Sequence, residues 1–578
     1  MSPSNGPRPN PGRIAASALV DGLAASGVEV AFGLDDPRGL FAELRRSDAV
    51  RPFIVHDERA GGYMADAYAR LTGRPVVCSG ISAAGAINLA PALLEAWRSS
   101  VPLIPVIGEF RPPEPYLHAF QEGPHLSLLG EGLVKDRVLV ERAEDAFAGG
   151  LRAGRLSLTG RPRPVLLLAP DSLLWEEEAP ARGSADDRRR LADVGPPAAP
   201  VERVAQARAA LAAAKRPVIY AGGGVNIAGA HDELSKLAMR YRIPVVTSMS
   251  GKGAIAETDP LALGVSSAYT SGEGGRGALA LRCLREADVV LVVGSDMDAL
   301  ATVDWTWPGP DATLVRIDID PSEFLGLPAI NLWGDAKRVL AQLVAEAPQA
   351  TPEREQWLTE LSAAVRSASD DVREADLARD DDGTVWPGAA LQVVGDDLRA
   401  GDIVIGDASY SSSWVLDRLV VDRPGRRVLA PRGSGMLGWG LPAGMGAALA
   451  CPGQRVTVVT GDGALQYSLC EMETAARAGL ALTVVLLNNG VYGSQRLSNL
   501  LAQEADYQDL HFGAGTDYVS LARSMGWEAV KVGSREDFAD AHRVARDRGG
   551  PWLIDVAVHP DSRPPLSKFD GAVPELQV

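Results

Sequence analysis

The sequence VTVVTGDG, residues 456–463, joins an apolar, β-branched run to the tripeptide Gly461-Asp462-Gly463. A second apolar run, residues 482–487, ends in Asn488-Asn489, and 24 residues separate this pair from the tripeptide. The intervening residues 468–478 have the composition of a helix. This strand–helix–strand order predicts two parallel strands whose carboxyl ends place the aspartate and the asparagines at one sheet edge.

The chemistry of these residues favours a metal–diphosphate site. Gly461 and Gly463 leave the backbone free to turn at a helix start, where N–H groups and the helix dipole attract a phosphate. Asp462 is a hard ligand suited to Mg²⁺, and we expect the Asn489 amide oxygen and the Val491 carbonyl to complete the set. Each motif alone is more often a plain turn or loop. Together, each directly after an apolar run, they favour the site.

The same alternation of apolar run and Ala/Leu-rich helical stretch recurs along the chain. Continuous apolar runs suit strands that are buried on both faces, and their alternation with helices implies parallel sheets. We predict an α/β fold of three doubly wound parallel-sheet domains. The predicted domains are residues 13–175, 200–347 and 386–560, followed by a tail, 561–578. The connectors, 175–201 and 347–386, are charged or polar and are expected to be solvated.

Composition excludes several classes of protein. The 578 residues are 46% hydrophobic and 23% charged, which is ordinary for globular domains and excludes a disordered or collagen-like chain. The net charge of −17 argues against nucleic-acid and anionic-membrane partners. No apolar run reaches about 18 residues, and the start lacks a signal-peptide pattern, so a cytoplasmic protein is expected. Four cysteines without a CxxC pair are expected to be buried free thiols: Cys78, Cys283, Cys451 and Cys470.

The paired motifs resemble those of the thiamine-diphosphate (ThDP) enzymes, in which GDG followed by NN binds magnesium diphosphate. Other stretches match this family in order along residues 13–560. Glu58 precedes a helix that contains Ala67-Tyr68-Ala69-Arg70, where the family has its glutamate. Further matches are Ala119-Phe120-Gln121-Glu122, as in acetolactate-synthase-like members, Arg316-Ile317-Asp318-Ile319-Asp320-Pro321, and the segment GSGMLGWGLP at 433–442.

The resemblance implies roles for particular residues. The three domains would be pyrimidine-binding, central and diphosphate-binding. Glu58 would hydrogen-bond the aminopyrimidine, Gln121 an acceptor carbonyl, and Leu437 would support the bent cofactor. The implied cofactor-binding residues are Glu58, Ser409, Tyr410, Gly435, Leu437, Gly461, Asp462, Gly463, Ala464, Asn489 and Tyr492, with Asp462, Asn489 and Val491 on the metal. Family members share each site between subunits, so a homodimer or homotetramer is expected.

The implied activity is ThDP- and Mg²⁺-dependent cleavage or formation of carbon–carbon bonds. An acetolactate-synthase-like carboligase acting on a 2-oxo acid through an enamine is preferred. Gln121 favours it, and Ile81 stands where benzoylformate-decarboxylase-like sequences carry a histidine. A 2-oxo-acid decarboxylase or a 2-hydroxyacyl-CoA lyase remains an alternative.

The glycine run at 221–225 raises two further options. FAD or ADP in the central domain is possible but not favoured, because a lone glycine run is weak evidence for a nucleotide. An NAD-linked oxidoreductase would need an acid about 20 residues on, at the end of the next strand. That run, 243–247, continues into Ser-Met-Ser-Gly instead.

Overall fold

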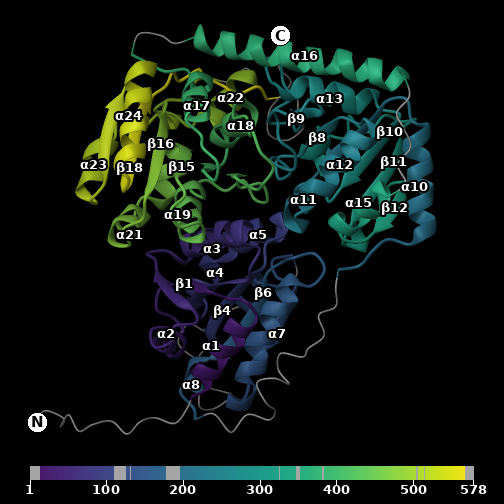
Figure 1. Ribbon diagram of the computed structural model, residues 1–578. Helices are drawn as coiled ribbons and strands as arrows, with labels where there is room; N and C mark the ends of the chain where they lie inside the picture. Colours follow the sequence, from purple (N-terminus) through teal and green to yellow (C-terminus); the bar gives the residue numbers. More distant parts are fainter. Residues whose placement is uncertain are drawn as a thin grey trace, which may run out of the picture. The chain divides into compact units, whose positions relative to one another are not determined.

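The computed structural model describes residues 14–109, 125–130, 132–177, 196–324, 326–345, 352–379, 383–502, 505–512 and 515–566. Within these ranges the chain forms three six-stranded sheets, and every pairing between their strands is parallel (Figure 1). The residues fall into two compact units, 1–194 and 195–578. The first unit contains one sheet and the second contains two. The predicted α/β fold of three parallel sheets is therefore confirmed.

The first unit is a doubly wound sheet. Its strands are ordered β2 (Arg51–Ile54), β1 (Val30–Gly33), β3 (Val76–Ile81), β4 (Leu103–Glu109), β6 (Val165–Pro170) and β5 (Asp136–Leu139). One face packs on α1 (Ala15–Ala25), α2 (Arg38–Leu44) and α7 (Ala146–Leu158). The opposite face packs on α3 (Glu58–Thr72) and α5 (Ala90–Ser99), where Phe32 meets the ring of Tyr68. The shorter helices are α4 (Ala84–Asn88), α6 (His125–Leu128), η1 (Ala143–Asp145) and α8 (Asp171–Leu174).

A buried ion cluster joins α3 to α5 in this unit. Arg70 donates to Asp66 at 2.9 Å and to Glu95 at 2.7 Å, and all three side chains are almost inaccessible to solvent. Ser99 donates to Glu95 at 2.8 Å. One guanidinium therefore serves two carboxylates inside the core, as its forked donors allow.

The second unit begins with the central sheet. Its strands are ordered β12 (Ile330–Trp333), β11 (Thr313–Asp318), β10 (Val289–Val293), β7 (Pro217–Ala221), β8 (Val245–Thr247) and β9 (Ala262–Val265). Separate apolar clusters cover its two faces. The helices of this part are α10 (Val201–Ala213), α11 (Gly223–Ala228), α12 (His231–Tyr241), α13 (Gly277–Glu286), α14 (Ala299–Thr302), η2 (Pro321–Phe324) and α15 (Ala336–Val344).

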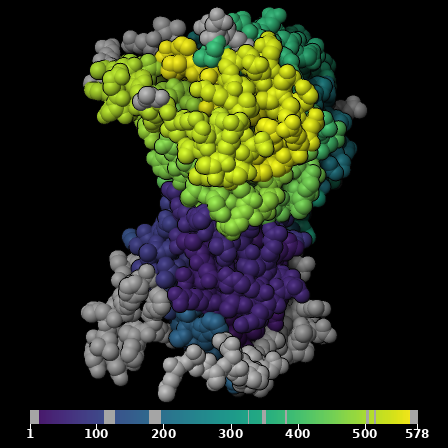
Figure 2. Space-filling model, turned by 90° about the vertical axis from the view of Figure 1, so that its left-hand side faces the viewer, coloured from purple at the N-terminus to yellow at the C-terminus, as the bar shows by residue number. Residues whose placement is uncertain are grey.

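The C-terminal sheet completes this unit, and the green-to-yellow residues of this part of the chain form most of the face of the unit that Figure 2 shows. The strand order is β14 (Val428–Leu429), β13 (Ile403–Gly406), β15 (Val456–Gly461), β16 (Leu482–Asn488), β18 (Pro551–Ala557) and β17 (Glu528–Val532). β15 and β16 are neighbours, with Gly461 opposite Leu487. The helices are α17 (Pro387–Asp396), α18 (Tyr410–Arg418), α19 (Gly440–Ala450), α20 (Asp462–Leu465), η3 (Gln466–Ser468), α21 (Glu471–Arg477), α22 (Gly493–Leu501), η4 (Gln508–Leu510), α23 (Tyr518–Ser524) and α24 (Arg535–Arg548).

The connector expected at 347–386 is a helix over most of its length, and most of its side chains are exposed or only partly buried, as expected of a solvated segment. Residues 352–377 form a 26-residue helix, α16 (Pro352–Leu377), which Figure 1 shows running along the second unit. Arg354 anchors it, because its buried guanidinium donates to the carbonyls of Leu211 at 3.0 Å and Tyr241 at 2.8 Å. These contacts give a polar helix a fixed place on the central domain.

Two smaller expectations also differ from the structure. The helix expected at 468–478 is shorter, because α21 spans only Glu471–Arg477 and Ser468 ends the preceding η3. Cys78 and Cys283 are buried as expected, whereas Cys451 is partly exposed and Cys470 is exposed. Cys470 lies at the start of α21, where the break between helices leaves its side chain at the surface.

Candidate active site

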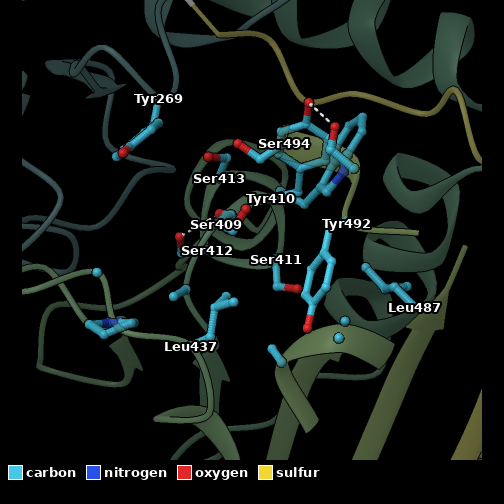
Figure 3. Close-up of a pocket in the computed structure, with 18 of the residues that line it drawn as sticks. Tyr269, Ser409, Tyr410, Ser411, Ser412, Ser413, Leu437, Leu487, Tyr492 and Ser494 are labelled. Atoms are coloured by element: carbon cyan, nitrogen blue, oxygen red, sulfur yellow. Dashed lines mark hydrogen bonds between the residues drawn. The ribbon is translucent and has the colours of Figure 1, made fainter. Parts of the chain in front are cut away.

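The second unit contains a cavity of about 360 Å³ at the carboxyl ends of β13, β15 and β16 (Figure 3). The central sheet also contributes to its wall, through Met249 and Tyr269 in the loops after β8 and β9 and through Leu300 in α14. Ligands of open parallel sheets bind beyond the carboxyl ends of strands. The cavity lining includes most of the residues singled out from the sequence: Ser409, Tyr410, Gly435, Leu437, Gly461, Asp462, Gly463, Ala464, Asn489, Val491 and Tyr492.

Asp462 and Asn489 are brought together as their positions after neighbouring strands predict. The Asp462 carboxylate is buried and accepts a hydrogen bond from the Gly490 N–H at 2.8 Å. The Asn489 side-chain oxygen accepts one from the Val491 N–H at 3.2 Å. Burial raises the pKa of Asp462 to about 6, and the nearby Asp555 acts in the same direction. A buried carboxylate that has no cationic side-chain partner favours the binding of a cation.

Gly463 of the GDG motif is required for side-chain packing rather than for a backbone turn. Gly461 has a φ of −88°, and neither Gly461 nor Gly463 has a positive φ, so the turn itself does not require glycine. A β-carbon on Gly463 would lie 2.8 Å from the Tyr492 ring. That ring packs edge-on against Phe512, with centroids 4.6 Å apart. Gly463 is therefore needed for the close approach of an aromatic side chain.

A run of hydroxyls at the start of α18 forms another wall. Ser411, Ser412 and Ser413 line the cavity beside Ser409 and Tyr410, and the sequence reading missed these three serines. Ser409 has a φ of 65°, an uncommon value for a residue other than glycine, directly before the helix. Four serines among five residues at a helix start could have been recognised as a donor-rich segment.

The loop that carries Leu437 is anchored by a buried carboxylate. Asp407, at the end of β13, accepts hydrogen bonds from the Ala408 N–H at 2.7 Å and the Thr460 hydroxyl at 2.9 Å. Burial raises the pKa of Asp407 to about 6, although these bonds and the N–H groups of Gly438 and Gly440 oppose the rise. Its position after an apolar run makes Asp407, like Ser409 and Tyr410, a candidate for contacts with the diphosphate or the pyrimidine, but Asp407 is not among the residues that line the cavity. Its contacts tie the Leu437 loop to β13 and β15.

We expect Asp407 to give the protein a characteristic dependence of stability on pH. Its pKa is higher in the folded protein than the ordinary 3.8, so between pH 4 and 6 the folded state binds more protons. Stability therefore falls as pH rises through this window, by up to about 3 kcal/mol. Asp407→Asn should remove this component, so the variant should gain thermal stability relative to wild type between pH 4 and 7.

Asp517 offers a matched control of opposite sign for this experiment. It is an exposed helix cap whose pKa is lowered by hydrogen bonds from Ser520. Asp517→Asn should lose stability relative to wild type only as pH rises toward about 4, and its melting curve should run parallel to that of wild type across pH 5–7. Parallel melting curves of wild type and Asp407→Asn across pH 4–7 would contradict the role given to Asp407.

Glu58 lies in the first unit, at the start of α3, and is partly buried. Its side chain accepts a hydrogen bond from the Asn88 amide at 2.8 Å. A β-carbon on Gly85 would lie 2.7 Å from a Glu58 oxygen, so glycine at this position leaves room for the carboxylate. The preceding Asp57 caps the helix by accepting from the Arg59 N–H at 2.8 Å. Gln121, the other predicted catalytic residue of this unit, lies outside the described residues.

The donor set of the cavity fits a magnesium diphosphate. Asp462, Asn489 and Val491 offer carboxylate, amide and carbonyl oxygens, the ligand types that Mg²⁺ prefers. Among the residues that the structure describes, no group of three or more His, Cys, Asp or Glu is arranged to hold a metal. The serine hydroxyls supply further donors for phosphate oxygens.

The glycine run of the central domain serves backbone packing. A β-carbon on Gly222 would lie 2.2 Å from the Gly294 carbonyl oxygen, and one on Gly224 would lie 2.7 Å from the Gly294 α-carbon. These contacts explain the glycines without a nucleotide. Separately, no helix in the described ranges combines the length and apolar character needed to cross a bilayer.

Comparison with known proteins agrees with this architecture. Models of the thiamine pyrophosphate enzymes match the N-terminal TPP binding domain at residues 13–127, the central domain at 204–343 and the C-terminal TPP binding domain at 407–556. The acetolactate synthase large subunit of Parasynechococcus marenigrum is 31% identical over 94% of this chain and 87% of its own length. A probable acetolactate synthase large subunit of Methanococcus aeolicus is 28% identical over 97% and 95%, respectively. With its sheets, its cavity and these full-length relatives, the chain belongs to the thiamine pyrophosphate enzymes.

Proposed function

We propose that this protein is a ThDP- and Mg²⁺-dependent carboligase that joins a 2-oxo-acid-derived unit to a carbonyl acceptor. The observation that carries the proposal is the meeting of Asp462 and Asn489 in one cavity, within a chain related over its whole length to acetolactate synthase large subunits. We place the domains at residues 13–175, 200–347 and 386–560, with 561–578 as a tail.

The second unit would hold the diphosphate end of the cofactor. Asp462, Asn489 and the Val491 carbonyl would bind Mg²⁺, while Ser409 and Tyr410 face the phosphates or the pyrimidine. Gly435, Gly461, Gly463, Ala464 and Tyr492 would complete the contact surface, and Leu437 would give apolar support beneath the rings. When bound, ThDP supplies a nucleophilic carbon and an electron sink for bond cleavage at a carbonyl.

The first unit would provide the residue that controls the proton at the aminopyrimidine end of the cofactor. The Glu58 carboxyl, oriented by the Asn88 amide, would hydrogen-bond the N1′ nitrogen of the aminopyrimidine. Such a contact would fix the tautomer of the aminopyrimidine ring. Glu58 would thereby act as a general acid–base group. Gln121 would donate to the acceptor carbonyl. Exclusion of water by the apolar wall of the cavity would strengthen each of these polar contacts.

We further propose that each site is shared between two copies of the chain, Glu58 from one and Asp462 from the other. Glu58→Gln and Asp462→Ala chains, each inactive alone, should then restore activity when they are dissociated, mixed and reassembled. Random pairing makes half of the dimers hybrid, each with one intact site, so about a quarter of wild-type activity is expected. Hybrid formation should be verified by differential tagging. Verified hybrids without activity would show that sharing is wrong.

The reaction itself is tested with purified holoenzyme and a panel of 2-oxo acids, aldehydes and 2-hydroxyacyl thioesters. Carboligation predicts release of CO₂ together with a product that contains the carbons of both substrates, read by mass spectrometry. CO₂ with free aldehyde would indicate a decarboxylase instead, and cleavage of the thioesters a lyase. Either of these last results would replace the proposed reaction.

A further inference from the structure

Strand β18 places a buried carboxyl group behind the proposed metal site. Asp555 lies in β18, which pairs with β16, and is 2% exposed. It is not among the described residues that line the cavity. Its Oδ1 accepts a hydrogen bond from the side-chain amide of Asn488, the last residue of β16, at 2.9 Å. Asn488 directly precedes Asn489, so this bond lies one residue away from a proposed metal ligand.

The end of β16 is attached to β18 through its backbone as well as through this side chain. The Val558 N–H donates to the Asn488 carbonyl at 3.0 Å. The residues that follow form a turn, which carries the Asn489 side chain and the Gly490 N–H that donates to Asp462 at 2.8 Å. A side chain that fixes Asn488 therefore also limits the positions that this turn can adopt.

The backbone of Asp462, the other proposed metal-binding residue, is attached independently. The buried Tyr518 hydroxyl of α23 donates to the Asp462 carbonyl at 3.3 Å and accepts from the Gln466 amide at 2.9 Å. The GDG turn therefore does not depend on Asp555 for its position. Loss of the Asp555 carboxyl group should displace the Asn489 side of the site and leave the backbone of Asp462 in place.

The charge of Asp555 also acts on the site. Burial is the main cause of the raised pKa of Asp462, and the proximity of Asp555 adds to it. Burial likewise raises the pKa of Asp555 itself, while the bond from Asn488 and the exposed Lys531 on β17 lower it. Electrostatic interactions are stronger in a buried environment than in water. A bound divalent cation would relieve the repulsion between the two carboxylates.

We propose that Asp555 is a positioning residue for the metal site, which acts through Asn488 to hold the turn that carries Asn489. This assignment rests on the proposed dependence on ThDP and Mg²⁺. Mg²⁺ requires a near-ideal octahedral arrangement of its ligands, so a small displacement of one ligand reduces its affinity. Residues that orient a metal ligand without touching the metal typically change metal affinity by about 10–100-fold when they are replaced.

The affinity for Mg²⁺ in the presence of ThDP tests this role without any turnover. Asp555→Ala removes the acceptor of the Asn488 amide and should weaken Mg²⁺ binding by about 10–100-fold, measured by isothermal titration calorimetry. Asp555→Asn keeps an oxygen acceptor of the same shape without the charge, and its Kd should fall between those of Asp555→Ala and wild type. It also provides the test if the alanine variant does not fold. Wild-type Kd values in these variants would overturn the proposal.

An exchange of the two side chains tests whether Asp555 acts through Asn488. Asn488→Asp alone places two carboxyl groups in contact, which repel each other when both are ionised, so Mg²⁺ binding should weaken. Asn488→Asp combined with Asp555→Asn restores an amide donor opposite a carboxylate acceptor, with the direction of the bond reversed. The double variant should therefore bind Mg²⁺ more tightly than Asn488→Asp. Additive losses in the double variant would show that Asp555 does not act through Asn488.

Asp402 supplies a matched control at the opposite end of the same sheet. It directly precedes β13, its side chain is 8% exposed, and it accepts from Arg546 at 2.7 Å. Asp402→Asn should lower the melting temperature of the cofactor-free protein but leave the Kd for Mg²⁺ unchanged. Equal losses of Mg²⁺ affinity in Asp402→Asn and Asp555→Asn would show that Asp555 stabilises the domain in general and does not position the site.

Asp462→Ala separates failure of this inference from failure of the metal site. If Asp462→Ala loses Mg²⁺ while Asp555→Ala keeps the wild-type affinity, the site stands and the positioning role is wrong. If Asp462→Ala keeps the wild-type Mg²⁺ content, the proposed site itself is wrong, and the role of Asp555 is wrong with it. Weaker binding in both variants supports both proposals.

Discussion

Glu58→Gln should lower turnover by about two orders of magnitude or more, which is the typical contribution of a positioned acid–base group. Glutamine has nearly the same shape and can still accept from the Asn88 amide, so the start of α3 should remain in place. It cannot exchange a proton with a ring nitrogen. The expected result is loss of the catalytic rate with the melting temperature unchanged, measured by steady-state kinetics and thermal unfolding.

Glu43 supplies a matched control for this variant. It lies in α2 of the same unit and forms a surface pair with Arg46 at 3.4 Å. Glu43→Gln removes one carboxylate charge, as Glu58→Gln does, but should leave the rate unchanged because exposed pairs contribute little. Near-wild-type turnover in Glu58→Gln would refute the proton-control role.

Asp462→Ala should reduce the retention of ThDP and Mg²⁺ by at least a hundredfold. Even residues that only support a metal ligand typically change metal affinity by about 10–100-fold, and Asp462 is proposed as a direct ligand. Equilibrium dialysis and metal analysis of the purified variant measure this loss. Added ThDP and Mg²⁺ should raise the melting temperature of wild type, since ligands stabilise the state that binds them, but not that of the variant.

The cofactor-free form should respond differently to this substitution. Because burial raises the pKa of Asp462, ionisation of this group costs stability at neutral pH, and its removal offsets the lost bond to Gly490. The unliganded variant should therefore melt close to unliganded wild type. Glu473→Gln, at an exposed side chain of α21, serves as the charge-matched control. Wild-type ThDP and Mg²⁺ content in Asp462→Ala would exclude it as a metal ligand.

The strands and their layering could be predicted from the sequence because both faces of each sheet are buried. Continuous apolar runs are then required, and β15 and β16 contain them at nearly the residues expected. Helix α16 could not be predicted in this way. Its sequence is polar, and its position depends on the contacts of Arg354 with carbonyls 140 and 143 residues away.

The residues of the candidate site also differ in whether the sequence could predict them. Asp462 and Asn489 were predictable, since residues that end adjacent parallel strands must meet at one edge. Arg432, which also lines the cavity, was not, because a lone arginine after a strand has no pattern, and its partner Asp298 lies 134 residues earlier. Asp407 could be singled out as a candidate cofactor contact, but its hydrogen bonds with the N–H groups of Gly438 and Gly440 depend on the folded loop. The spacing of residues within one strand–helix–strand segment can be recognised in a sequence. The contacts of a residue with side chains from distant segments cannot.

The contribution of Met249, Tyr269 and Leu300 to the cavity has a consequence for protein engineering. A C-terminal sheet that is transplanted into another scaffold would carry the proposed diphosphate-binding residues. The cavity would then lack the wall that the central domain supplies. Chimeras should therefore move the loops after β8 and β9 and helix α14 together with that sheet, so that the crossover point falls upstream of the central sheet rather than inside α16.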